Sequence, residues 1–171
     1  KLTSIGKPAN KRVVFNPYQK PWLGLWPKLY GAPFPDVSAL SNWEQVQAEW
    51  ESILEELEAL NSSENNGFER GIYDGFDGLP WQTCYFNLFG QRNNKLHELC
   101  PKTSALLELL PGNNVHTCFS RIDPGASLPP HVGPSNAWLI GHLGLLNCED
   151  THIFSGAENK TFKKGEWLVL D

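Results

Sequence analysis

The sequence predicts a mainly β fold with flanking helices, of the double-stranded β-helix (jelly roll, cupin-like) type. After residue 81 the chain alternates short strands and turns, apart from one helix. Residues 41–60 repeat apolar side chains with helical spacing, which adds a buttressing helix outside the sheets. The length of 171 residues suits one domain with one core. The mouth of such a jelly roll is the natural place for a metal and a small ligand.

The first 36 residues are expected to form an extended arm. Six of the thirteen prolines lie here, and this density disfavours regular helix. Aromatic side chains recur between the prolines and need burial: Phe15, Tyr18, Trp22, Trp26, Tyr30 and Phe34. We therefore divide the chain into an arm, residues 1–36, and a jelly-roll domain, residues 37–171. The arm packs either on its own domain or on a partner protein.

A helix is predicted over residues 41–60. Ser41 and Glu44 have the spacing of a capping box, in which each side chain accepts a hydrogen bond from a backbone N–H of the first turn. An apolar stripe follows, and the acidic residues beside it are predicted to form a solvated face. Polar turn-forming residues at 61–67 end the helix, and the glycine-rich residues 71–80 predict a loop or hairpin.

The remaining elements are mostly strands. Aromatic and β-favouring residues predict strands over 81–89 and 115–122, with further strands at 153–154 and 162–171. Between the first two strands, residues 100–112 predict a short helix with Thr103 or Ser104 near its N-cap and Pro111 at its end.

The most informative stretch, residues 128–145, sets His131 beside prolines and Gly133 and places His142 eleven residues later in an apolar run. Proline and glycine fix a loop, while a strand aims every second side chain to one side. Neutral imidazole is a common metal ligand, although a histidine beside a turn or within a sheet is also often a hydrogen-bonded structural residue. The residues alone leave both interpretations open.

Composition narrows the functional classes. The net charge of −5, with basic residues scattered along the chain, argues against a nucleic-acid partner. No apolar run is long enough to span a bilayer, so a soluble domain is expected, in the cytoplasm or in an organelle such as the ER lumen. The chain starts at Lys1 and contains no Met, so we expect a preceding segment that could attach it to a membrane. The four cysteines lack a CxxC spacing and are expected to be buried thiols.

His131-Val-Gly-Pro-Ser-Asn136, followed by His142-Leu-Gly-Leu, resembles the signature of the aspartyl/asparaginyl β-hydroxylases, a family of iron(II) and 2-oxoglutarate dioxygenases. The resemblance extends from about Trp26 to Asp171 and is strongest between Ser120 and Leu145. It implies Fe(II) and 2-oxoglutarate as cofactors of the full-length chain. His131 would be the first iron ligand, and Gly133 occupies the position where most such dioxygenases have a carboxylate. His142 and Ser120 would bind 2-oxoglutarate.

This sequence departs from the family pattern at three places. Trp138 and Ile140 replace two arginines that serve anionic groups, so the substrate pocket implied by Asn136, Trp138 and Ile140 is apolar or uncharged. A pair of family cysteines corresponds to His97 and Ser104. The resemblance also places the last strands and the distal iron histidine beyond Asp171, and His152 is the alternative ligand within the chain.

Two functions follow from these residues. The first is a dioxygenase that hydroxylates a peptide side chain, a small molecule or a lipid, with 2-oxoglutarate as small-molecule cosubstrate. The second is a catalytically degenerate family member that serves as a binding or structural subunit of a larger assembly, docked through the arm. Four retained residues favour the enzyme: Ser120, His131, Asn136 and His142. Trp138, Ile140 and the lack of the distal iron histidine up to Asp171 favour the subunit.

Overall fold

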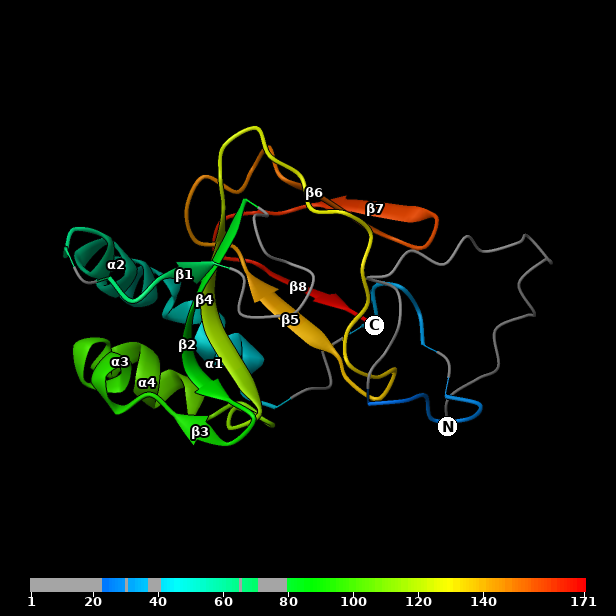
Figure 1. The fold of residues 1–171 in the computed structure, drawn as a ribbon, viewed down its shortest axis with the longest axis horizontal. Coiled ribbons are helices and arrows are strands. Elements are labelled where there is room, and N and C mark those ends of the chain that lie inside the picture. The colour runs from blue at the N-terminus through cyan, green and yellow to red at the C-terminus, as the bar shows by residue number, and fades with distance from the viewer. Residues whose placement is uncertain (1–22, 30, 37–40, 65, 71–79) are drawn as a thin grey trace.

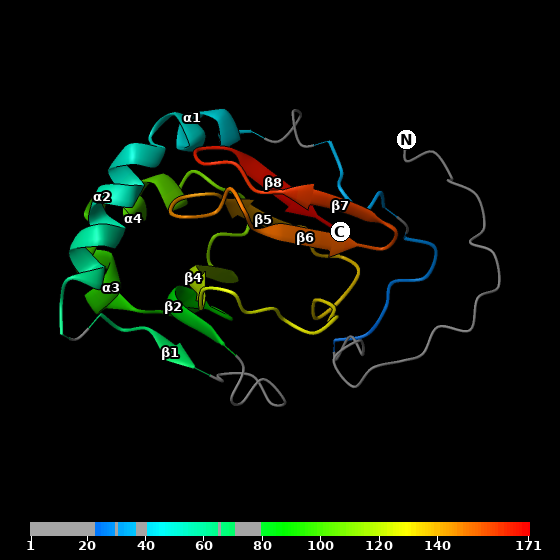
Figure 2. The ribbon, with the colours of Figure 1, turned by 90° about the horizontal axis from the view of Figure 1, so that it is seen from above.

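The computed structural model describes residues 23–29, 31–36, 41–64, 66–70 and 80–171. Figures 1 and 2 show this part of the chain as two halves side by side, one of helices on a sheet and one of smaller sheets. The expectations for residues 1–22, for residues 37–40 and for most of the loop at 71–80 lie outside the described residues.

Two helices replace the single helix predicted over residues 41–60: α1 (Trp43–Ala48) and α2 (Trp50–Asn61). The capping-box prediction is wrong, because Asn42 occupies the N-cap position and no side chain caps α1. Asn42 has a left-handed backbone (φ 70°), and its Nδ2 donates a hydrogen bond to the Leu109 carbonyl over 2.8 Å. A distant loop therefore fixes the start of this helix.

Helix α3 (Asn94–Leu99) was not expected from the sequence, whereas α4 (Pro101–Leu107) lies within the predicted range 100–112 and ends before Pro111. The predicted N-cap at Thr103 or Ser104 is wrong, since Pro101 already occupies the first helical turn. The first turn of α4 is instead capped from α2. Both carboxylate oxygens of Glu56 accept hydrogen bonds, one from the Lys102 N–H and one from the Thr103 N–H, each over 2.8 Å.

The larger sheet contains four antiparallel strands, and its centre is β2 (Trp81–Leu88). One edge of β2 pairs with β1 (Glu69–Arg70) and β3 (Gln91–Arg92), and the other edge pairs with β4 (His116–Ile122). The strands predicted over 81–89 and 115–122 are therefore confirmed.

Two smaller antiparallel sheets form the other half, β5 (Ile140–Leu143) with β8 (Trp167–Leu170), and β6 (His152–Ser155) with β7 (Glu158–Thr161). Among the described residues these strands do not close into a barrel. The protein is thus a mixture of helices and small antiparallel sheets, an arrangement compatible with a jelly roll.

The core lies between the helices and one face of the larger sheet. Phe86 of β2 and Phe119 of β4 meet edge to face, with ring centroids 5.1 Å apart. Buried side chains from α1, α2, β2, α3 and the junction of α3 with α4 complete the cluster: Val46, Ile53, Leu60, Cys84, Leu96 and Cys100. Burial raises the pKa of the Cys84 thiol to about 11 and that of the Cys100 thiol to about 12. No helix in the described ranges has both the length and the apolar character needed to cross a bilayer.

The described part of the arm packs against its own domain. The Leu23 N–H donates to the Pro134 carbonyl over 2.9 Å, and the Asp171 N–H donates to the Pro33 carbonyl over 3.4 Å. Lys160 places its ammonium 4.7 Å from the centroid of the Phe34 ring. The arm thus runs from the loop that carries His131 to the end of β8 (Figure 1).

Candidate active site

The face of the larger sheet opposite the core carries the first candidate residue. Strand alternation on β4 directs His116, Cys118 and Ser120 to this face, because Phe119 between them points into the core. Trp81, at the start of β2, donates a hydrogen bond from Nε1 to the Ser120 hydroxyl over 2.7 Å. The expected 2-oxoglutarate residue Ser120 is therefore held by an indole N–H.

His131 lies on the loop between β4 and β5, and its side chain is exposed. Its Nδ1 is 2.8 Å from the Pro129 carbonyl oxygen. Since a carbonyl only accepts, Nδ1 carries a proton, and a hydrogen bond of this kind is what orients metal-binding histidines in proteins so that Nε2 can bind the metal. The imidazole and the Trp81 indole have centroids 6.1 Å apart, so Trp81 contacts both His131 and Ser120.

His142 lies on β5 opposite Leu168 of β8 and is half-buried. Its ring meets the edge of Phe162 at a centroid distance of 5.8 Å. Removal from water, together with the charges of His116 and His131, lowers the pKa of His142 to about 4. His142 is thus neutral near pH 7, and three histidines from β4, β5 and the intervening loop lie close enough to interact.

His116 and Trp81 are the residues that we did not single out from the sequence. The His116 ring stacks obliquely on Tyr85 with centroids 5.2 Å apart, and its Nε2 lies 3.9 Å from the Cys118 sulfur. Burial lowers the pKa of His116. Counting back from Ser120 in steps of two along the predicted strand would have placed His116 on the same face.

The three residues assigned to the substrate pocket make different contacts. Ile140, at the start of β5, lies against the loop that carries His131. A Cβ atom added to Gly133 of this loop would be 3.6 Å from the Cδ1 atom of Ile140. Trp138 instead contacts Phe89, with ring centroids 6.2 Å apart. The structure therefore places Ile140 against the loop that carries His131 and Trp138 against Phe89, just after β2.

Asn136 binds the arm. Its Oδ1 accepts a hydrogen bond from the Trp26 N–H over 2.8 Å, while its Nδ2 donates to the carbonyls of Trp26 at 3.1 Å and Leu29 at 3.0 Å. One backbone donor and two backbone acceptors determine the amide orientation. Within the described residues, this side chain fastens the arm to the loop that carries His131.

Comparison with known proteins shows the family. A sequence model of the aspartyl/asparaginyl beta-hydroxylases matches residues 41–171 of this chain. The chain belongs to this family. It is 30% identical over 136 residues to the aspartyl/asparaginyl beta-hydroxylase of Homo sapiens and 30% identical over 161 residues to aspartate beta-hydroxylase domain-containing protein 2 of Rattus norvegicus. It is also 29% identical over 152 residues to the ornithine lipid ester-linked acyl 2-hydroxylase of Rhizobium tropici.

These alignments cover 76%, 90% and 84% of this chain, respectively. They cover 17%, 47% and 54% of the relatives' own lengths. The chain thus spans about half, or less, of the curated relatives that it matches.

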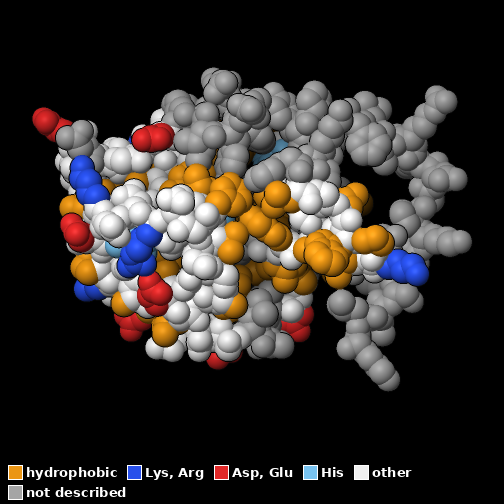
Figure 3. Space-filling model, turned by 60° about the horizontal axis from the view of Figure 1, so that its bottom comes forward, with side chains coloured by type: hydrophobic (Ala, Val, Ile, Leu, Met, Phe, Trp, Pro, Cys, Tyr) orange, Lys and Arg blue, Asp and Glu red, His pale blue; other side chains and the backbone are white. Residues whose placement is uncertain are grey.

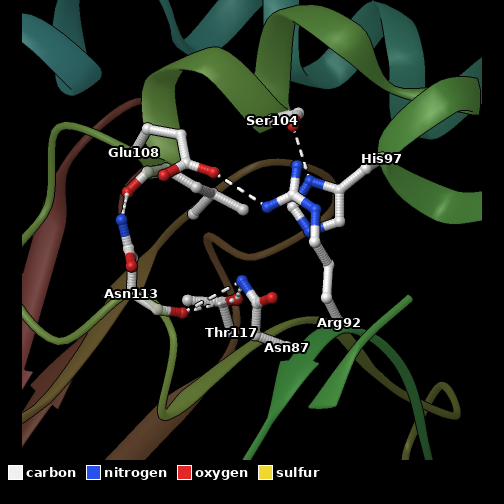
Figure 4. A network of polar contacts seen from close by, with 8 residues as sticks. Asn87, Arg92, His97, Ser104, Glu108, Asn113 and Thr117 are labelled. Carbon is white, nitrogen blue, oxygen red and sulfur yellow. Dashed lines mark hydrogen bonds and ion pairs between the residues drawn. The ribbon is translucent and has the colours of Figure 1, made fainter. Parts of the chain in front are cut away.

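A hydrogen bond joins His97 and Ser104, the two residues that the resemblance aligns with a pair of family cysteines. His97 Nδ1 and Ser104 Oγ are 2.5 Å apart, and both side chains are buried (Figure 4). Burial lowers the pKa of His97, and the nearby Arg92 guanidinium also lowers it. Arg92 itself forms an ion pair with Glu108, with 2.8 Å between nitrogen and oxygen. The contact between α3 and α4 is thus kept without a covalent link.

Among the described residues, no three His, Cys, Asp or Glu side chains are placed to hold a metal ion together. His152, the alternative ligand, lies on the outer β6–β7 hairpin and contacts the Thr161 hydroxyl at 3.3 Å. Of the β-hydroxylase site residues, His131 is the one whose surroundings resemble those of a metal ligand.

Proposed function

We propose that this β-hydroxylase relative is an iron(II) and 2-oxoglutarate dependent dioxygenase that hydroxylates a substrate uncharged at the reacting carbon. The observation that carries the proposal is the His131 side chain, oriented by the Pro129 carbonyl on a loop that faces Ser120 and His142. We propose further that the larger sheet and the smaller sheets belong to the two halves of a jelly roll, with these residues at its mouth.

His131 would hold the metal through Nε2, because its Nδ1 proton is engaged by the carbonyl. Bound iron(II) and 2-oxoglutarate would supply the oxidising chemistry for an unactivated C–H bond. The Ser120 hydroxyl, positioned by Trp81, can donate to a carboxylate of 2-oxoglutarate, and the neutral His142 can donate to the same ligand. A second histidine, which the resemblance places beyond Asp171, would complete the protein ligands.

The preference for an uncharged substrate comes from Ile140. This side chain lies against the His131 loop, where the family pattern has an arginine. Burying a carboxylate without a cationic partner costs several kcal/mol, so an acidic side chain should bind poorly. Trp138 replaces the second arginine, and its ring lies against Phe89 just after β2.

The test is titration of the full-length protein with manganese(II), followed by turnover of 2-oxoglutarate with neutral and with aspartyl peptides. His131→Ala should weaken metal binding at least tenfold, because loss of a direct ligand removes its bond to the metal. His152→Ala removes a histidine from the outer hairpin and is the matched control.

Equal metal binding by wild type and His131→Ala would refute the assignment of the ligand. Efficient hydroxylation of aspartyl peptides would refute the substrate preference. Absence of turnover with every substrate, together with absence of metal binding, would favour the second function, a degenerate member that acts as a binding subunit, which the replacement of both arginines also supports.

A further inference from the structure

Large apolar side chains lie exposed beside the His131 loop, on two segments that the fold brings together. Leu23, Leu25 and Trp26 belong to the arm, while Val132 and Leu139 belong to the loop and its exit. The Leu23–Pro134 and Trp26–Asn136 hydrogen bonds hold the two segments side by side. We call these five side chains the apolar rim.

Charge is almost absent from the two segments. Residues 124–148 contain no Asp, Glu, Lys or Arg, and residues 21–35 contain Lys28 alone. The whole chain, in contrast, carries 19 acidic and 14 basic residues. Figure 3 shows the same asymmetry on one face of the molecule, where hydrophobic side chains gather at the centre and right and most charged side chains lie at the left.

Exposed contiguous apolar surface is rare on monomeric proteins and marks a site of interaction. Lys28 is the one charged residue of the two segments, whereas the edge of a protein–protein contact is commonly polar. The carbonyls of Trp26 and Leu29 already accept hydrogen bonds from Asn136. Trp26, with two-thirds of its surface exposed (66%), stands next to Pro27 and Lys28. A tryptophan followed by a lysine suits the boundary between acyl chains and headgroups of a bilayer.

We propose that the apolar rim docks on the surface of a lipid bilayer, with the His131 loop facing the membrane. The rim is continuous with the mouth of the proposed site, because Val132 adjoins His131 and Leu139 adjoins Ile140. The docking proposal rests on the proposed function in one respect: it identifies the uncharged substrate as a membrane lipid. Docking itself is a property of the surface and needs no turnover.

The test is cosedimentation of the full-length protein with phosphatidylcholine vesicles. Leu23→Ser and Trp26→Ser should each lower the partition coefficient about tenfold, which corresponds to about 1.4 kcal/mol of lost apolar burial. Added salt should not release the protein, because the rim carries almost no charge. Both substituted side chains are exposed, so the variants should fold, as thermal unfolding will verify.

Two matched controls lie off the rim. Leu99→Ser on α3 changes a leucine as exposed as Leu23 (52% against 53%), and Phe154→Ser on β6 removes an aromatic ring more exposed than Trp26 (72%). Both controls should partition like wild type. The proposal is overturned if wild type does not partition, or if rim and control variants lose binding equally. It is also overturned if light scattering shows a dimer that Trp26→Ser dissociates, since the rim would then join two copies of the chain.

Discussion

Asn136 shows how one side chain can connect distant parts of a site. Its amide satisfies a backbone N–H and two backbone carbonyls of the arm at once, which only Asn or Gln can do with one planar group. The resemblance assigned Asn136 to the substrate pocket. The hydrogen bonds to Trp26 and Leu29 give it a role in holding the arm next to His131.

Asn136→Asp should detach the arm. The substitution keeps the shape but replaces two donated hydrogen bonds by a carboxylate facing the carbonyls of Trp26 and Leu29. We expect faster amide hydrogen exchange in residues 23–29 and a free energy of unfolding lower by about 1–3 kcal/mol. The control is Asn159→Asp, the same chemical change on the exposed β7 strand. Unchanged exchange in the arm would contradict this role for Asn136.

At the scale of elements, the cap of α4 explains why α2 and α4 pack together. Glu56 reaches from α2 and accepts both N–H groups of the first turn, and a negative charge there also interacts favourably with the helix dipole. Its neighbour Glu55 makes a 3.3 Å ion pair with Lys102, and both of these side chains are exposed. We therefore expect Glu56 to contribute more to the free energy of unfolding than its neighbour Glu55.

Glu56→Ala should lower the free energy of unfolding by about 1–2 kcal/mol, because two helix N–H groups lose their acceptor. Glu55→Ala is the matched control and should change it by about 0.5 kcal/mol or less, as expected for an exposed ion pair. Urea denaturation of both variants measures the difference. Equal losses would mean that the carboxylates act through charge and not through capping.

A helix or strand could be predicted from the sequence when the residues that determine it lie within the element itself. Strands β2 and β4 follow from their own aromatic and β-favouring residues, so both were predicted. The start of α1 depends on Asn42 binding Leu109, 67 residues away, and the start of α4 on Glu56, 46 residues before Lys102. No sequence window contains both partners, and these helix starts were therefore misplaced.

The same limit applies to the candidate site. His131, Ser120 and His142 were assigned to the site because one motif and its flanking strands resemble the β-hydroxylase signature. The contact of Asn136 with the arm joins residues 110 positions apart, and the Trp81 contact with Ser120 joins residues 39 positions apart. Such pairings depend on the tertiary fold, which the motif does not specify.

At the scale of the whole molecule, histidines that are wholly or partly withdrawn from water should make the fold sensitive to acid. Burial lowers the pKa values of His97, His116 and His142, that of His142 to about 4. Between the unfolded value of about 6.5 and the lower folded values, the unfolded chain binds more protons. Stability contributed by the neutral histidines is therefore complete above about pH 6.5 and is lost as the pH falls below it.

We expect the free energy of unfolding of the metal-free protein to fall between about pH 7.5 and about pH 5.5, by about 1.4 kcal/mol for each histidine that stays neutral. His142→Gln should flatten this dependence, and His152→Gln, which removes an exposed histidine, should not. Chemical denaturation across the pH range measures both. A dependence of the same slope in wild type and His142→Gln would exclude His142 as a cause.

The attachment of the arm also has a consequence for the order in which the protein folds. Trp26 and Asn136 are 110 residues apart, and the arm also meets Asp171. Contacts between residues so far apart in the sequence form late, because the chain loses the entropy of closing a long loop before the contacts stabilise the fold. The helices and the β2–β4 pair can assemble while the ribosome is still adding residues, whereas the mouth beside His131 closes after the C-terminal strands have emerged. A nascent chain is thus unable to present a finished site before its synthesis has passed β8.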